Sequence, residues 1–477
     1  MEDFSSLSQI QSALVNRELV LSDLVEGYLR RIEERKELNA FVEVFTEETK
    51  SAALRIQDKI EAGTSGKLAG MVIGIKDNIC YKDHKVSASS RILEDYTSPF
   101  SATVVERLLA EDAIIIGRLN CDEFAMGASN ESSYYGPVRN NADHTKVSGG
   151  SSGGSAVAVQ ADLCLAALGT DTGGSVRQPA SFCGVIGLKP TYGRVSRHGI
   201  ISYASSFDQV GPITHSVEDA ALILEVIAGP DDYDSTASSK PVPVYSKHQS
   251  GGLKKKVAYL SEALNSPGLD PEVKAVFERS IDRLRTDGHT VEPVSFELLE
   301  YVVPTYYILT MAEASSNLAR YDGVHFGFRS EKARDLESTY KGTRSEGFGP
   351  EVKRRIILGT FVLSAGYYDA YYAKAQKVRR LIREKTDEIL SGYDFIMLPT
   401  APAPAFTIGE ASDDPVVNYL ADIFTVQATL AGIPAISLPA GNNGKGLPLG
   451  MQFLGKRFEE DELLSFSKNI EGLLKFR

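Results

Sequence analysis

Cysteine is scarce in this sequence, and its pattern argues against both a disulfide framework and a cysteine-based zinc site. The 477 residues contain four cysteines, and no two of them form a CxxC pair. Three lie among apolar neighbours, which is typical of small buried thiols in a reducing compartment. We therefore expect the four thiols to be buried: Cys80, Cys121, Cys164 and Cys183.

Long apolar runs and an excess of basic residues are also missing. No run reaches the roughly 18 apolar residues of a membrane-spanning helix. The first residues, MEDFSSLSQI, match neither a signal peptide nor a basic transit peptide. The net charge of −12 argues against a broad nucleic-acid-binding surface, although it leaves room for a local basic patch or for a partner that holds nucleic acid. We expect a cytoplasmic protein that makes no contact with membranes.

Several familiar catalytic and metal-binding motifs are absent. The phosphate loop GxxxxGK[ST], the dinucleotide fingerprint GxGxxG and the zinc motif HExxH do not occur, and Ser175 stands outside the nucleophile-elbow pattern GxSxG. The seven histidines form no ligand motif, so we expect no metal. His144 and His198 lie nearest to the serine clusters described below, which leaves a Ser–His pair open. We expect the adjacent acids Asp122 and Glu123 to be structural or solvated.

Two clusters rich in glycine and serine dominate the middle of the chain. The first reads GGSSGGS over residues 149–155, and the second reads DTGGS over residues 171–175. Between them, residues 156–168 are small and apolar, whereas a flexible linker would be followed by polar sequence. The pattern predicts buried turns, where missing side chains let the backbone approach another backbone or a ligand closely.

Apolar segments with strand character alternate with segments of helical periodicity, which predicts an α/β fold. Neither an internal repeat nor a clear linker occurs, and the polar residues 231–250 are typical of a loop. The expected strands cover residues 41–45, 68–75, 113–117, 163–168, 185–188, 257–260, 290–294 and 394–398. The expected helices cover residues 7–34, 46–62, 102–110, 155–161, 216–228, 350–390 and a segment that opens at Pro271.

Lys76 directly follows the apolar strand expected at 68–75, although lysine is almost never buried without a reason. Its amine either reaches water along a packed stem or acts as a base for a serine, which is a weak nucleophile without one. Burial can lower a lysine pKa from about 10.4 by roughly three units, and a second serine can relay the proton. Backbone N–H groups in glycine-rich turns can stabilise an oxyanion by about 3 kcal/mol each.

Together these residues resemble the amidase signature family over nearly the whole chain. The resemblance is carried by Lys76, by GGSSGGSA and by DTGGSVRQPA, with 24 residues from Ser151 to Ser175. It implies a Ser-cisSer-Lys triad in which Ser175 is the nucleophile, Ser151 bridges from a cis peptide and Lys76 is the base. It also implies that Asp171 and Arg177 form a structural ion pair. The implied oxyanion hole consists of the backbone amides of Thr172, Gly173, Gly174 and Ser175.

The resemblance to the amidase signature family also implies an architecture. We expect one large α/β domain over residues 1–477, with a central mixed β-sheet covered on both faces by helices. Within it, residues 1–65 form an N-terminal helical region and residues 66–230 form the catalytic core. Residues 231–477 supply the remainder of the sheet and a glutamine-binding region.

Further segments resemble one branch of that family, the glutaminase subunits of tRNA-dependent amidotransferases. They read NCDEFAMG, GLKPTYGRVSRHGI, SSFDQVGPIT, EVKRRIILGTF and LADIFTVQATLAGIPAISLPAG. This resemblance implies that the chain hydrolyses glutamine. Arg355 would bind the α-carboxylate, for which its planar fork is suited. Asp422 would bind the α-ammonium group, and Tyr306 would make a further contact with the substrate.

The same branch implies partners rather than cofactors on this chain. We expect a heterotrimer with a tRNA-binding kinase/transamidase subunit, which holds ATP, Mg²⁺ and most of the tRNA, and a small bridging subunit. The ammonia would convert Glu-tRNA(Gln), or Asp-tRNA(Asn), and the sequence does not decide between them. Two alternatives remain, a stand-alone amidase of small or fatty amides and an inactive scaffold. A scaffold has no use for a buried lysine beside two serines.

Overall fold

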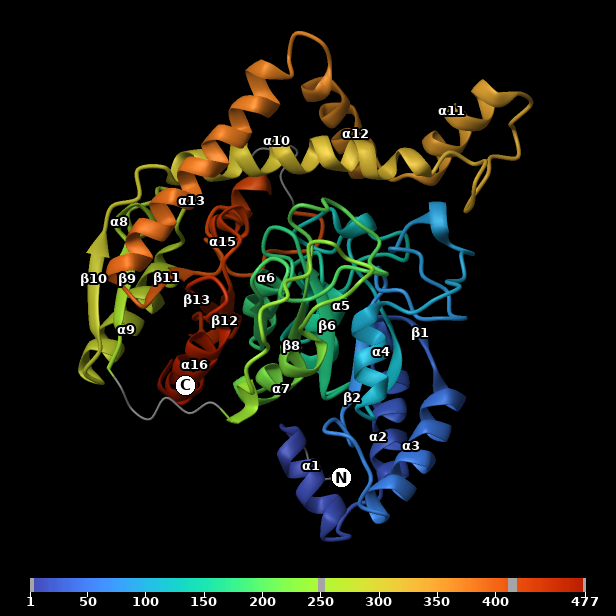
Figure 1. The fold of residues 1–477 in the computed structure, drawn as a ribbon, viewed down its shortest axis with the longest axis vertical. Helices are drawn as coiled ribbons and strands as arrows, with labels where there is room; N and C mark the ends of the chain where they lie inside the picture. Colours follow the sequence, from blue (N-terminus) through green and yellow to red (C-terminus); the bar gives the residue numbers. More distant parts are fainter. Residues whose placement is uncertain (1–3, 248–253, 411–417, 475–477) are drawn as a thin grey trace.

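The computed structural model describes residues 4–247, 254–410 and 418–474, and it is built around one large mixed sheet (Figure 1). The sheet has 11 strands in the order β1-β3-β2-β6-β8-β7-β12-β13-β11-β9-β10, and β4 pairs with β5 separately. The strands are β1 (Phe41–Val44), β2 (Val72–Lys76), β3 (Ile114–Leu119), β4 (Arg139–Asn140), β5 (Asp143–Val147), β6 (Ala166–Asp171), β7 (Ile186–Lys189), β8 (Gln209–Thr214), β9 (Lys256–Leu260), β10 (Thr290–Val294), β11 (Phe395–Pro399), β12 (Ala435–Asn442) and β13 (Pro448–Leu454).

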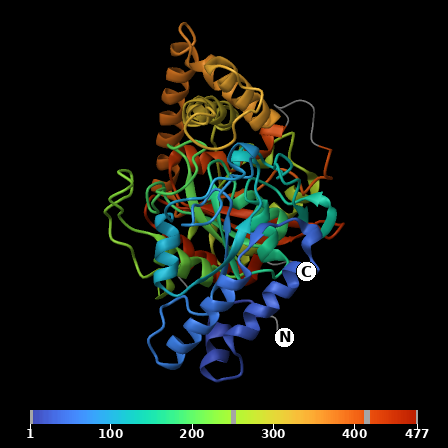
Figure 2. The ribbon, with the colours of Figure 1, turned by 90° about the vertical axis from the view of Figure 1, so that its right-hand side faces the viewer.

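Helices cover both faces of this sheet, as Figures 1 and 2 show from two directions. The predicted single α/β domain with a mixed sheet is therefore confirmed, whereas the finer division at residues 65 and 230 stays a prediction. The helices are α1 (Leu7–Val15), α2 (Leu21–Glu34), α3 (Thr46–Glu61), α4 (Thr103–Ala110), α5 (Gly153–Gln160), α6 (Arg177–Cys183), α7 (Val217–Ile227), α8 (Ser261–Leu264), α9 (Pro271–Thr286), α10 (Leu299–Asn317), α11 (Leu336–Gly347), α12 (Pro350–Leu363), α13 (Lys374–Gly392), α15 (Val426–Ala431) and α16 (Glu460–Leu474).

The parallel pairing of β2 with β6 brings the two chemically interesting parts of the sequence together. Ile75 of β2 lies opposite Leu168 of β6, so both strands end at the same edge of the sheet. Both strands are buried along their whole length, as expected for parallel strands covered on both faces. Their last residues are Lys76 and Asp171, so the lysine lies beside the start of the second glycine–serine cluster.

Two helices predicted as continuous are interrupted in the structure. The prediction at 7–34 is wrong because the chain turns between α1 and α2, where Arg17 has a φ of 60°. The prediction at 350–390 is wrong because Gly366, with a φ of 85°, lies between α12 and α13. A left-handed residue cannot continue a right-handed helix, and the apolar periodicity on either side hides the break.

The sequence did not predict β8, β12 or α10, and each contains residues that usually interrupt regular structure. Gly211 and Pro212 lie within β8, Pro439 lies within β12, and Pro304 lies within α10. Glycine and proline are the strongest local signals for turns, so these segments resemble loops when read alone. Tertiary packing overrides that signal here, since β8 pairs with both β6 and β7, and β12 pairs with both β7 and β13.

Three smaller predictions can be compared with the structure. All four cysteines are buried and free, as expected. In the predicted loop at 231–250, residues 231–247 are irregular except for one short 3₁₀ turn, and residues 248–250 lie outside the described residues. Within the described ranges, no helix has both the length and the apolar character needed to cross a membrane.

A buried ion pair joins the segment after β7 to the last helix. Glu460, the first residue of α16, accepts a hydrogen bond from the Thr191 amide at 2.9 Å and lies 3.3 Å from the Arg194 guanidinium. The side chains of Arg194 and Glu460 are almost fully buried. Removing one partner would leave the other charge buried without compensation, so this pair links the two segments energetically.

We predict that Glu460→Ala lowers the free energy of unfolding by about 3–5 kcal/mol, the usual cost of breaking a buried ion pair. Glu459→Ala is the matched control, because its side chain is exposed and should change stability by no more than about 0.5 kcal/mol. Urea titration followed by circular dichroism measures both variants. Equal effects in the two variants would contradict the prediction.

Candidate active site

The two glycine–serine clusters lie against each other as buried turns. The Ser152 amide donates a hydrogen bond to the Ser175 carbonyl at 3.1 Å, and the Gly150 amide donates to Gln178 Oε1 at 2.9 Å. The peptide bond from Gly150 to Ser151 is cis. The close approach predicted for these glycines is present, because a Cβ on Gly154 would lie 2.3 Å from a backbone oxygen.

The amine of Lys76 is fully buried among hydroxyl groups at the end of β2. Its Nζ atom lies 2.6 Å from Ser151 Oγ, 2.9 Å from Ser152 Oγ and 3.0 Å from Thr170 Oγ1. Burial lowers the pKa of Lys76 to about 8, since a protonated amine loses its hydration there. A substantial fraction of this amine is therefore neutral near physiological pH and able to accept a proton.

The surrounding hydrogen bonds favour Ser151 as the proton donor to that neutral amine. The Ser152 hydroxyl donates to the Thr170 carbonyl at 3.2 Å, so its oxygen is left to accept from Lys76. Thr170 Oγ1 accepts from Asn78 Nδ2 as well as from Lys76. The Ser151 hydroxyl contacts Lys76 alone among the described residues, so its proton can point at the lone pair of a neutral amine.

Ser175 is the member of the predicted triad that a substrate can reach. Its exposed fraction is 8%, whereas Lys76 and Ser151 are completely buried. Within the described residues its hydroxyl makes no hydrogen bond, and its backbone carbonyl is held by the Ser152 amide. The structure thus gathers all three residues in one place, and their individual roles stay predictions.

Three of the four backbone amides predicted to form the oxyanion hole are free to bind a ligand. In the described residues, the amides of Thr172, Gly173 and Ser175 donate no hydrogen bond. The Gly174 amide differs, because it donates to Asp171 Oδ1 at 2.8 Å. In this structure, therefore, three of the four amides predicted for the oxyanion hole have an N–H group without a hydrogen bond, and the hole itself stays a prediction.

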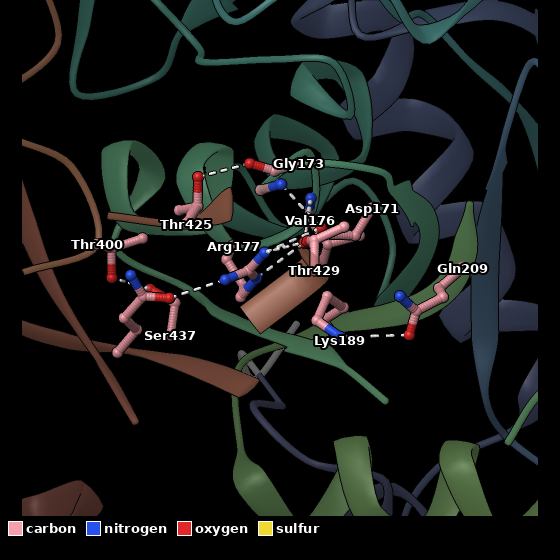
Figure 3. Close-up of polar contacts among 12 residues, drawn as sticks. Asp171, Gly173, Val176, Arg177, Lys189, Gln209, Thr400, Thr425, Thr429 and Ser437 are labelled. Carbon is pink, nitrogen blue, oxygen red and sulfur yellow. Dashed lines mark hydrogen bonds and ion pairs between the residues drawn. The ribbon is translucent and has the colours of Figure 1, made fainter. Parts of the chain in front are cut away.

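Asp171 and Arg177 form the predicted structural ion pair beneath this loop (Figure 3). Arg177 Nε and Nη2 lie 3.0 and 3.1 Å from the two carboxylate oxygens, and Nη1 donates to Gln452 Oε1 at 2.8 Å. Burial acts to raise the pKa of Asp171, but the charge and hydrogen bonds of Arg177 hold it below its ordinary value. Since the same carboxylate accepts from the Gly174 and Val176 amides, the pair fixes the backbone around Ser175.

A second lysine, Lys189 at the end of β7, shows that burial alone does not make a base (Figure 3). Burial lowers its pKa to about 7. Its Nζ atom donates to the carbonyls of Pro190 and Ile433 and to Gln209 Oε1, at 3.0, 2.6 and 3.3 Å. None of these partners is a hydroxyl that could pass on a proton, so Lys189 has a structural role.

The predicted glutamine-binding residues come from three separate elements and meet around Tyr307. Arg355 of α12 lies over the ring of Tyr307 at 5.3 Å, and its Nη1 donates to the Tyr203 hydroxyl at 2.8 Å. Asp422, in the short 3₁₀ helix η7 (Leu420–Asp422), accepts from the Tyr307 hydroxyl at 2.6 Å. Burial raises the pKa of Asp422 to about 6, so its carboxyl group is mostly ionised at neutral pH.

Tyr306 connects this group to the glycine–serine loop. A Cβ on Gly173 would lie 2.4 Å from the Tyr306 hydroxyl, so the ring occupies the space that only glycine leaves open. Thr425 lies beside them and donates to the Gly173 carbonyl at 2.5 Å (Figure 3). The loop expected to hold the oxyanion therefore packs directly against the residues expected to hold the substrate.

The described residues support neither a catalytic Ser–His pair nor a metal site at the adjacent acids Asp122 and Glu123. His144 is exposed, and the His198 ring stacks against Phe100 and Tyr233, away from both serines. Asp122 is buried and accepts hydrogen bonds from nearby backbone amides, which is the structural role expected of it. Among all the described residues, no group of three or more His, Cys, Asp or Glu side chains could hold a metal ion.

Sequence reasoning missed five residues of this site: Ser152, Thr170, Tyr203, Asp208 and Tyr307. Ser152 and Tyr307 are immediate neighbours of predicted residues, which was the only signal for them. Asp208 accepts from the Thr172 hydroxyl at 2.7 Å and from two backbone amides, and burial raises its pKa to about 7. The two amides belong to the nearby Tyr203 and Ala204, whereas the contact with Thr172 spans 36 residues, and no local pattern encodes it.

Curated relatives align with almost the whole chain. The chain is 50% identical over 476 residues to a protein from Prosthecochloris aestuarii named as the A subunit of glutamyl-tRNA(Gln) amidotransferase, covering 98% of this chain and 99% of the relative. A protein of the same name from Koribacter versatilis is 49% identical over 97% of each chain.

Solved structures share the fold. The A subunit of glutamyl-tRNA(Gln) amidotransferase from Thermotoga maritima superposes with a TM-score of 0.80 at 41% identity, covering 97% of this chain and 94% of that one. The peptide amidase of Stenotrophomonas maltophilia gives a TM-score of 0.82 at 29% identity, covering 97% and 96%. A profile of the family described as Amidase matches residues 23–464, which contain the buried lysine, both glycine–serine clusters and the tyrosine–arginine–aspartate group. The chain therefore belongs to the amidase family of enzymes.

Proposed function

We propose that this chain is the glutamine-hydrolysing subunit of a tRNA-dependent amidotransferase. The observation that carries the proposal is the group formed by Arg355, Tyr307 and Asp422 beside the Gly173 loop. An amidase acting on simple amides needs no cation and anion beside its nucleophile. Glutamine carries both an α-carboxylate and an α-ammonium group, and each requires a charged partner. The names of the relatives at about 50% identity support the same activity.

The proposed reaction uses Lys76 at the end of β2, Ser151 in contact with it, and Ser175 on the adjoining loop after β6. Neutral Lys76 takes the proton of Ser151, which takes the proton of Ser175 as Ser175 Oγ attacks the side-chain amide carbon of glutamine. The amides of Thr172, Gly173 and Ser175 stabilise the oxyanion. The carbon–nitrogen bond then breaks, and the proton returns through Ser151 to the departing ammonia. Water hydrolyses the acyl-enzyme along the same path, so glutamine and water give glutamate and ammonia.

Recognition of glutamine follows from the charges around Tyr307. Arg355 is buried, and its Nε atom forms an ion pair with Glu351 at 2.8 Å, while Nη2 donates no hydrogen bond within the described residues and is proposed to bind the substrate carboxylate. The Asp422 carboxylate is proposed to bind the α-ammonium group. Tyr306 lies between that pair and Gly173, where it would contact the substrate side chain.

In the proposed complex, other subunits bind the nucleotide and the tRNA. A partner subunit would bind ATP, Mg²⁺ and tRNA and activate the misacylated Glu-tRNA(Gln), or Asp-tRNA(Asn), which then receives the ammonia. A small third subunit would bridge the two. The net charge of −12 agrees with tRNA being held mainly by that partner. The alternative is a stand-alone amidase, for which the fold shared with a peptide amidase is the main support.

We predict that Ser175→Ala and Lys76→Met each abolish release of glutamate from glutamine, because one removes the nucleophile and the other removes its base. Ser155→Ala is the control. Ser155 is buried in the same region, but among the described residues its hydroxyl forms a hydrogen bond with the Leu168 carbonyl alone. Glutamate release is measured with and without partner subunits, ATP and misacylated tRNA. Full activity of Ser175→Ala in any mixture would contradict the assignment.

We predict that Arg355→Gln lowers kcat/KM for glutamine by about 10- to 100-fold, mainly through KM, because it removes a hydrogen bond to a charged group. The same variant should keep its activity toward a simple aliphatic amide, which has no α-carboxylate. Arg354→Gln is the matched control, since Glu351 pairs with both arginines but Arg354 is exposed whereas Arg355 is buried. Equal losses on both amides would favour the stand-alone amidase.

We predict that kcat/KM for glutamine rises with pH in two steps. The upper step lies near the Lys76 pKa of about 8, because only the neutral amine can act as a base. The lower step lies near the Asp422 pKa of about 6, because the ionised carboxylate binds the ammonium group. In Asp422→Asn the lower step should disappear and the upper step remain. A profile that falls as pH rises through the Lys76 pKa would contradict the role of the lysine.

A further inference from the structure

A basic cavity outside the predicted site is lined by four arginines. It has a volume of about 350 Å³, and it lies between α13, the end of α15 and the segments around Tyr192 and Arg457. In Figure 1, α13 and α15 lie beside each other. None of the residues assigned above to catalysis or glutamine binding lines it. The lining arginines are Arg379, Arg380, Arg383 and Arg457.

The charges of this cavity are only partly balanced. None of the described carboxylates lines it, but Glu384 and Asp387 pair with its arginines. Glu384 contacts Arg380 at 2.6 Å, while Asp387 is shared between Arg457 at 3.2 Å and Arg383 at 3.8 Å. With Glu313, which acts on Arg379 without forming an ion pair, three carboxylates oppose four guanidinium groups, which leaves a small excess of positive charge in a concave space.

Arg379 is held in this cavity without an acidic partner. Its Nε and Nη2 atoms donate to the carbonyls of Leu430 and Ser206 at 3.3 and 3.2 Å, and its guanidinium lies 4.1 Å from the centre of the Phe207 ring. Among the described residues, no carboxylate lies within ion-pair distance of it. The side chain is thus fixed in place by neutral groups, unlike a solvated surface arginine that is free to turn away.

The arrangement carries an electrostatic cost when the cavity holds no anion. Arg379 and Arg383 are four residues apart on α13, where like charges repel. Burial lowers the pKa of Arg379, Glu313 and Tyr192 oppose that shift, and Arg383 adds a smaller lowering effect. A bound anion would remove this repulsion, so its binding would be favoured by the charges already in place.

We propose that this cavity binds a small phosphorylated molecule through its four arginines. The guanidinium fork matches the geometry of phosphate oxygens, and several forks around one cavity suit a multiply charged group better than a single carboxylate. The volume is in the range of small-molecule sites. An RNA backbone needs an extended basic track instead, whereas these arginines line a single cavity of about 350 Å³.

The test is calorimetric titration of the full chain with pyrophosphate at low ionic strength, with Arg380→Gln/Arg383→Gln as the variant. We expect the wild type to bind pyrophosphate, added salt to weaken the binding, and the variant to bind at least about tenfold more weakly. Arg30→Gln is the control, because Arg30 is also an exposed arginine paired with a glutamate one turn along its helix. Its affinity for pyrophosphate should equal that of the wild type.

Several results would overturn the proposal. One is that the wild type does not bind pyrophosphate. Another is that the double variant and Arg30→Gln bind pyrophosphate equally well. The third is that a short RNA hairpin binds in a way that depends on these arginines while pyrophosphate does not bind. If the double variant has a lower melting temperature than the control, Arg380→Gln alone keeps the test decisive, since that side chain is 79% exposed. Glutamine hydrolysis should be unchanged in all these variants.

Discussion

The burial of the Lys76 amine among hydroxyl groups is the constraint on which the rest of the site depends. β2 is an interior strand that lies between β3 and β6, and the lysine at its end is completely buried. Such an amine must lose its proton or find several partners, and here Ser151, Ser152 and Thr170 provide them. The same burial that costs stability produces the neutral base that serine chemistry needs. Lys189 bears a similar cost and gains no such chemistry, because its partners are carbonyl and amide oxygens.

The glycines of the two clusters let three other segments of the chain pack closely against the loops beside this lysine. A Cβ on Gly150 would lie 2.1 Å from Asp122 Oδ2, and a Cβ on Gly174 would lie 2.4 Å from Thr425 Oγ1. Gly173 leaves room for Tyr306 in the same way. The loop that carries Ser175 is therefore pressed between the base on one side and the tyrosine–arginine–aspartate group on the other. The buried Asp171–Arg177 pair holds its backbone from below.

The sequence predicts the centre of the site better than its periphery. Lys76 follows a strongly apolar strand, and the serines stand in glycine clusters that a linker would not flank with apolar sequence, so local patterns indicate the lysine and the two clusters. The choice of Ser151 and Ser175 among the serines came from the resemblance to the family. The local sequence pattern did not distinguish the catalytic candidate Lys76 from Lys189, which stands at the end of a buried strand in the same way. Arg355 and Asp422 were predicted only through the resemblance to a family, because they lie on different elements and meet through Tyr307. The division between α12 and α13 was missed since helical periodicity continues on both sides of Gly366.

The most direct test of this account is the mass of the enzyme during turnover of glutamine. Acid quenching of the wild-type chain, with its partners if these are needed for activity, should trap a glutamyl ester, and peptide mapping should place that ester on Ser175. Lys76→Met should accumulate none, because Ser175 would then lack a base. A glutamyl group on any other residue, or glutamate release with no covalent species under conditions that slow hydrolysis of the ester, would contradict the central claim that a buried lysine activates Ser175 through Ser151.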